Sequence, residues 1–142
     1  MAEAVMKQLV EERREPISVC SRGLISPEHA TVHPRAVTVL RANGLDIDEN
    51  RPPVRLSFSD VHRADLILVM EQAQRAALRR EFPAYTGKVH TLGHWQGVEI
   101  KDPLGGDEQQ FKDCLSAIRV GVVAWLERIR DMQPVRRTNG RY

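Results

Sequence analysis

The chain has 142 residues, of which 42% are hydrophobic and 28% charged, with a formal net charge of +2. This composition is ordinary for one globular domain with its own core. The small charge and sparse aromatics do not indicate nucleic-acid binding, and no apolar run reaches the ~18 residues of a membrane-spanning helix. The two cysteines are too few for a disulfide framework, so we expect a reducing, cytoplasmic location.

The first third of the chain is predicted to hold a helix, a strand and a second helix. Apolar residues recur at helical spacing over residues 2–10, and Pro16 ends that pattern. Ile-Ser-Val-Cys at residues 17–20, closed by Ser-Arg-Gly at 21–23, predicts a short strand. Pro34 suits the first turn of a helix, and Gly44 suits its end.

The middle of the chain alternates strand and helix patterns. Ser57 with Asp60 predicts a capping box for a short helix. The unbroken apolar run at residues 66–70 predicts a strand buried on both faces, as in a parallel sheet. A helix over residues 71–81 and a strand over 88–92 follow. Three strands alternating with helices predict an α/β fold with a parallel sheet.

The last predicted helix begins after Asp107, which can cap it together with Gln110. Its apolar stripe has alternating spacings of four and three residues; it consists of Phe111, Leu115, Ile118, Val122, Trp125 and Ile129. We place one domain at residues 1–131 and interpret residues 132–142 as a flexible basic tail.

The loop before this helix contains the candidate catalytic residue, Asp102. Pro103 disfavours a helical backbone at Asp102, and Gly105 with Gly106 permits a tight reversal. Such a loop can hold a carboxylate over a cleft for proton transfer, although an Asp-Pro pair also commonly opens a turn. We expect Asp102 in an exposed loop near Met1, at the carboxyl edge of the sheet, where open α/β sheets bind ligands.

The remaining motifs do not indicate a metal or cofactor site. His90 and His94 are four residues apart, but on a predicted strand and turn rather than on one helix face. Neither the dinucleotide-binding glycine motif nor the phosphate-loop lysine motif is present. We therefore expect no metal and no cofactor.

Five stretches resemble, in order and spacing, the low-molecular-weight protein tyrosine phosphatases. They are Met-Ala-Glu-Ala at 1–4, His-Pro-Arg-Ala-Val at 33–37, Ala-Asp-Leu-Ile-Leu-Val-Met-Glu at 64–71, Lys-Val at 88–89 with Leu-Gly-His-Trp at 92–95, and Ile-Lys-Asp-Pro at 100–103. The Gly-His-Trp segment resembles the bacterial branch that acts in capsule and exopolysaccharide synthesis.

The resemblance implies a three-layer αβα fold with a four-stranded parallel sheet. It also implies a phosphate-binding loop, Cys-x5-Arg, whose thiolate attacks phosphorus. Asp102 takes the position of the aspartate that protonates the leaving phenol and then activates water. In relatives the segment Met-Ala-Glu-Ala directly follows this loop. The first, central strand and the loop are therefore expected to be absent here, either because the listed start lies too far downstream or because the chain is a truncated relative.

Neither cysteine replaces the expected nucleophile. The residue six positions after Cys20 is Ser26 rather than arginine, and we interpret Cys20 as a buried cysteine at a strand end. Cys114 is interpreted as a core residue of the last helix. The chain as written is therefore expected to be inactive towards phosphate esters.

Three readings remain open at this point. The first is a phosphotyrosine phosphatase whose substrate is a phosphotyrosine protein, such as a bacterial tyrosine kinase of polysaccharide export. The second is a catalytically dead relative or binding module. The third is protein-arginine dephosphorylation or arsenate reduction on the same scaffold. Leu104 bears on this choice, because many relatives have an aromatic residue there that walls the phosphotyrosine ring.

Overall fold

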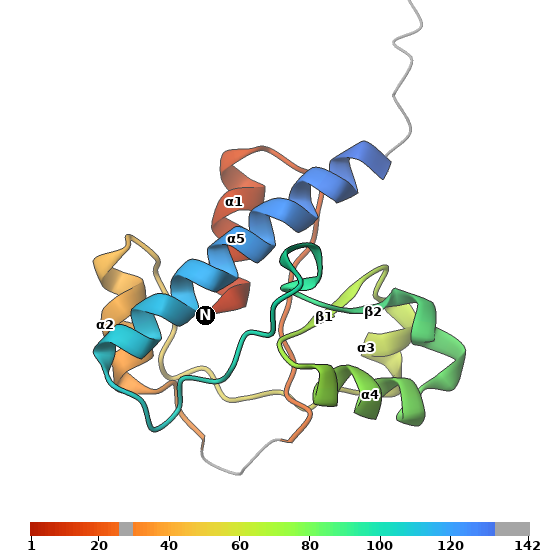
Figure 1. Cartoon of the computed structure of the whole chain (residues 1–142), viewed down its shortest axis with the longest axis horizontal. Helices are drawn as coiled ribbons and strands as arrows, with labels where there is room; N and C mark the ends of the chain where they lie inside the picture. Colours follow the sequence, from red (N-terminus) through yellow and green to blue (C-terminus); the bar gives the residue numbers. More distant parts are fainter. Residues whose placement is uncertain (26–29, 133–142) are drawn as a thin grey trace, which may run out of the picture.

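The computed structural model describes residues 1–25 and 30–132 (Figure 1). Its elements, in chain order, are α1 (Ala2–Glu12), α2 (Pro34–Ala42), α3 (Phe58–Arg63), β1 (Ile67–Val69), α4 (Gln72–Glu81), the 3₁₀ turn η1 (Pro83–Lys88), β2 (Val89–Thr91), the 3₁₀ turn η2 (His94–Gln96) and α5 (Glu108–Met132). Most of the proposed tail, residues 133–142, lies outside the described residues.

The sheet is a parallel pair, with α4 and η1 forming the crossover between its strands. Leu68 of β1 is opposite His90 of β2. Two backbone bonds continue the pairing beyond the strands: Leu92 donates to Val69 over 2.8 Å, and Ile100 donates to Met70 over 3.2 Å. The second bond places the segment leading to Asp102 at the carboxyl end of β1.

The side chains of β1 enter two separate apolar clusters. Leu66, Leu68 and Met70 pack against the core formed mainly by α1, α2 and α5. Ile67 and Val69 pack on the opposite face, in a cluster with Leu78 of α4 and Val89 of β2. Figure 1 shows α4 and α5 on opposite sides of the strands. This arrangement confirms the three-layer αβα fold.

The long helix α5 covers one face of this sheet along the predicted stripe. All six stripe positions except Ile129 are buried. Trp125 donates from Nε1 to the carbonyl of Thr91 over 3.1 Å. Gly121 allows a close approach, because a Cβ there would lie 2.8 Å from the Leu92 carbonyl oxygen. The helix is thus fixed to the end of β2, just before the Asp102 loop.

Local capping signals predicted several helix ends correctly. Ser57 and Asp60 form the reciprocal capping box of α3. The predicted stop at Gly44 is also observed, with a left-handed φ of +72°. The expectation that Pro16 ends α1 was wrong, because the helix stops at Glu12 and Arg14 turns the chain with φ +54°.

The predicted strand at residues 17–20 is extended but is not part of the sheet. Ile17 donates to Glu15, and among the described residues no other backbone bond involves this segment. Its burial alternates, with Ile17 and Val19 half-buried and Ser18 and Cys20 exposed. The prediction of a strand was therefore wrong, because strand pairing depends on a partner that a local pattern does not specify.

These unpaired segments predict self-association. Two short strands and an extended segment without a ladder expose backbone groups that can pair with another chain. We expect the isolated chain to be marginally stable and to aggregate at micromolar concentration. Ser18→Lys, which adds a charge at the exposed edge, should reduce light scattering more than Ser116→Lys on α5. A cooperative melt of a clean wild-type monomer would contradict this expectation.

Candidate active site

An open cleft of about 710 Å³ lies at the carboxyl edge of the sheet. Met70 after β1, the first turn of α1 and the Asp102 loop contribute to its walls. Asp102 is exposed and lines this cleft together with Met1, as the sequence predicted. The charged residues of the lining are Glu3, Lys7, Arg22, Asp46, Asp48, Arg51, Glu71, Lys101 and Asp102.

The Asp102 loop is a compact turn. Asp102 Oδ1 accepts a hydrogen bond from the Leu104 amide over 2.9 Å. The Gly106 amide donates to the Pro103 carbonyl over 2.8 Å, and Gly105 has a φ of +82°, which favours glycine. Among the described residues the other Asp102 oxygen has no hydrogen-bond partner. The hydrogen bond to Oδ1 therefore fixes the orientation of the Asp102 carboxyl group, while the second oxygen stays available to a reactant.

Contacts with the rest of the protein fix both ends of this loop. At its start, Glu99 Oε1 accepts a hydrogen bond from the Gln72 amide over 2.7 Å, which caps α4 with a negative charge. At its end, Asp107 and Gln110 form the predicted reciprocal cap of α5, with bonds of 2.9 and 2.8 Å. The Arg35 guanidinium of α2 donates to the Gly106 carbonyl between these two points.

Glu3 is the centre of a charged network on the opposite wall. Its carboxylate accepts from Ser21 and pairs with Lys7 Nζ at 2.7 Å and Arg51 Nη1 at 2.9 Å. Burial alone would raise the pKa of Glu3, but the bonds from Lys7, Ser21 and Arg51 outweigh it and lower the pKa to about 2. The network joins α1, the segment after Cys20 and the loop before α3.

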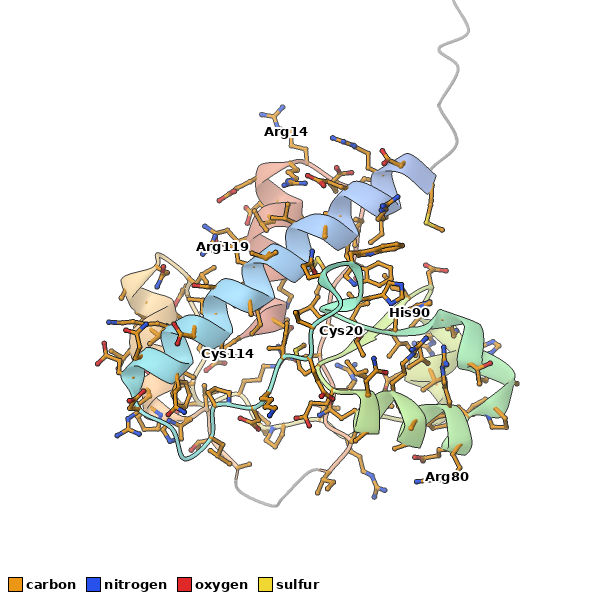
Figure 2. The ribbon with its side chains drawn as sticks, in the orientation of Figure 1. Arg14, Cys20, Arg80, His90, Cys114 and Arg119 are labelled. Atoms are coloured by element: carbon orange, nitrogen blue, oxygen red, sulfur yellow. The ribbon has the colours of Figure 1, made fainter. Side chains whose placement is uncertain are left out.

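Neither cysteine has the environment of a phosphatase nucleophile. Cys20 is exposed, so its interpretation as a buried residue was wrong. Cys114 is half-buried and lines the cleft, and burial raises the pKa of its thiol, which disfavours the reactive thiolate. The two residues come from different elements, the extended segment and α5 (Figure 2). Residue 120, six after Cys114, is valine.

His90 and His94 lie in an aromatic cluster away from Asp102. Their ring centroids are 5.7 Å apart, and Trp125 contacts both rings. Within residues 1–25 and 30–132, no group of three potential metal ligands gathers. In the same part of the chain, no helix is both long and apolar enough to span a membrane.

Comparison with known proteins identifies the scaffold that carries this cleft. Residues 1–135 match the family model described as low molecular weight phosphotyrosine protein phosphatase. The chain belongs to this family. It is 38% identical over 130 residues to the probable low molecular weight protein-tyrosine-phosphatase EpsP of Ralstonia solanacearum, which covers 92% of this chain and 86% of that protein.

Two further family relatives differ in their described activities and ligands. A protein-arginine-phosphatase of Bacillus subtilis is 27% identical over 115 residues, covering 79% of this chain and 75% of the relative. The structure of Vibrio vulnificus Wzb in complex with benzylphosphonate superposes with a TM-score of 0.76 at 27% identity, covering 89% and 87% of the two chains. The family scaffold therefore occurs in proteins named for tyrosine and for arginine dephosphorylation.

Sequence reasoning did not assign roles to the residues that support the cleft. Glu3 and Arg35 belong to the stretches that carry the resemblance, yet Glu3 pairs with Arg51, 48 positions away, and Arg35 donates to Gly106, 71 positions away. Glu99 looked like one acidic residue among many. The charge of each residue and the positions of Glu3 and Arg35 near helix starts can be read from the sequence, but the partners of these residues cannot.

The Glu3 network predicts a specific acid sensitivity. The lowered folded-state pKa means that the unfolded chain binds more protons between about pH 4.5 and 2, so stability is lost as pH falls through that window. Glu3→Gln should reduce the acid-induced loss in the free energy of unfolding by about 0.5–1 kcal/mol, a value that allows for solvent screening. Urea unfolding at pH 5, 4 and 3 measures it, with Glu12→Gln as the control. Equal acid dependence in all three proteins would contradict the prediction.

Proposed function

We propose that this domain is the acid–base half of a phosphate-ester hydrolase, with Asp102 as the general acid and base. The observation that carries the proposal is the Asp102 carboxyl group, which is oriented by the Leu104 amide and lines the cleft with one oxygen that has no partner among the described residues. Lys101 lines the same cleft, whereas Lys7 and Arg51 are paired with Glu3 and Arg22 with Asp60, so the charge of the lining by itself does not select an anionic substrate.

The proposed reaction proceeds in two steps. A thiolate attacks phosphorus and the phosphorus–oxygen bond to the leaving group breaks, while protonated Asp102 gives its proton to the departing oxygen. The Asp102 carboxylate then takes a proton from water, which attacks the cysteinyl phosphate and releases phosphate and the thiolate. The 142 residues contain no Cys-x5-Arg, so the reaction requires such a loop in addition to the residues present here.

We propose phosphotyrosine in a protein as the substrate. The match to the phosphotyrosine phosphatase family and the similarity to EpsP support this choice. The resemblance of residues 93–95 to the exopolysaccharide branch favours a cytoplasmic tyrosine kinase of polysaccharide export as the target. Phosphoarginine is the second candidate, supported by the Bacillus subtilis relative and by Leu104, which offers no aromatic wall.

The test adds a nucleophile loop to the domain. A family-type strand followed by Cys-x5-Arg-Ser-Pro is fused ahead of Met1, and turnover is compared with that of the chain as it stands. We expect no hydrolysis of p-nitrophenyl phosphate by the 142-residue chain, because one carboxylic acid supplies only ~10²- to 10⁴-fold acceleration. The fused protein should hydrolyse aryl phosphates. If it folds but stays inactive, the reading as a dead relative or binding module replaces this proposal.

The role of Asp102 is tested by leaving-group dependence. Asp102→Asn in the fused protein should lower kcat for tyrosine phosphate by about 10²- to 10³-fold, because the phenolate departs without a proton. The loss should be much smaller for p-nitrophenyl phosphate, whose leaving group needs little protonation. Asp113→Asn, an exposed carboxylate of α5, is the matched control. An equal loss with both substrates would exclude Asp102 as the acid.

A further inference from the structure

Few hydrogen bonds within the Asp102 loop stabilise its residues 102–106. Over residues 102–106 the internal bonds are those from the Leu104 amide to Asp102 and from the Gly106 amide to Pro103. Two adjacent glycines give this stretch a flexible backbone. Within the described part of the chain, Arg35 provides the one hydrogen-bond donor that reaches residues 102–106 from another element.

The backbone of Arg35 is itself held in place. His33 caps α2, and its Nδ1 accepts from the Arg35 amide over 3.2 Å. The His33 ring stacks on Phe111 with centroids 4.9 Å apart. Phe111 is only 2% exposed and belongs to the first turns of α5. The start of α2 is therefore fixed against the start of α5, next to the point where the loop ends.

We propose that Arg35 is a positioning residue that holds the Asp102 loop over the cleft. Its guanidinium donates to the Gly106 carbonyl and thereby fixes the turn whose Leu104 amide orients the Asp102 carboxyl group. Arg35 touches no reacting atom; it acts through the loop backbone. The catalytic part of this inference rests on the proposed role of Asp102, whereas the structural part does not.

The structural part is tested by hydrogen exchange on the fused protein described above, because the isolated chain is expected to aggregate. Arg35→Met removes the donors and keeps a long side chain, while Arg35→Lys keeps one charged donor. Arg41→Met is the matched control, because Arg41 lies on the same helix and pairs with Glu49 away from the loop. We expect Leu104 and Gly106 amides to exchange about 10-fold faster in Arg35→Met than in Arg41→Met, with Arg35→Lys restoring most of the protection. Equal protection in all variants would overturn the proposal.

The catalytic part is tested in the fused protein described above. Arg35→Met should lower kcat for tyrosine phosphate by about 10-fold with little change in KM, and less for p-nitrophenyl phosphate. In an Asp102→Asn background it should cause no further loss, because the group it positions is gone. A loss that persists in that background would overturn a role through Asp102.

The two proposals fail in distinguishable ways. If Asp102 is not the acid, Asp102→Asn shows no leaving-group dependence, while Arg35→Met still loosens the loop by hydrogen exchange. If Arg35 does not position the loop, exchange is unchanged in Arg35→Met while Asp102→Asn still discriminates between the two substrates. A change confined to the melting temperature, equal in Arg35→Met and Arg41→Met, also contradicts the positioning role.

Discussion

Packing of β1 on both faces is the constraint on which the rest of the structure depends, although of residues 66–70 only Val69 is fully buried and the others are half-buried. Leu66, Leu68 and Met70 belong to one apolar cluster and Ile67 and Val69 to the other, so helices must cover both sides of the sheet. The parallel pairing of β1 with β2 requires a crossover, which α4 and η1 provide. Both strands then end at the same edge, and the segments that follow them form the cleft.

The cleft combines a rigid frame with residues of opposite charge. On one wall, Glu3 joins three chain segments through Lys7, Ser21 and Arg51, and burial of its carboxylate is compensated by these bonds. At the two ends of the Asp102 loop, Glu99 and Asp107 use their carboxylates to cap α4 and α5. Among the described residues the Asp102 carboxylate accepts one hydrogen bond, from the Leu104 amide, so unlike Glu99 and Asp107 it caps no helix.

The two cysteines decide whether the 142 residues include a nucleophile for the phosphatase reaction. Family membership rests on nearly the whole chain, but the reaction that the resemblance implies requires a thiolate and an arginine in one loop. Cys20 is exposed on an unpaired segment, and Cys114 lies where burial disfavours its thiolate. In the function proposed above, Asp102 transfers the proton, and attack on phosphorus needs a Cys-x5-Arg loop in addition to the 142 residues present.

The sequence by itself determined the elements whose causes are local. The unbroken apolar run at 66–70, the capping boxes at Ser57 and Asp107 and the stripe on α5 predicted β1, α3 and α5, and the Asp-Pro-Leu-Gly-Gly turn predicted an exposed Asp102. Only the tertiary structure decided the rest. Whether residues 17–20 pair, where Arg35 donates and which cations surround Glu3 depend on contacts between distant segments, and local propensity carries no information about such partners.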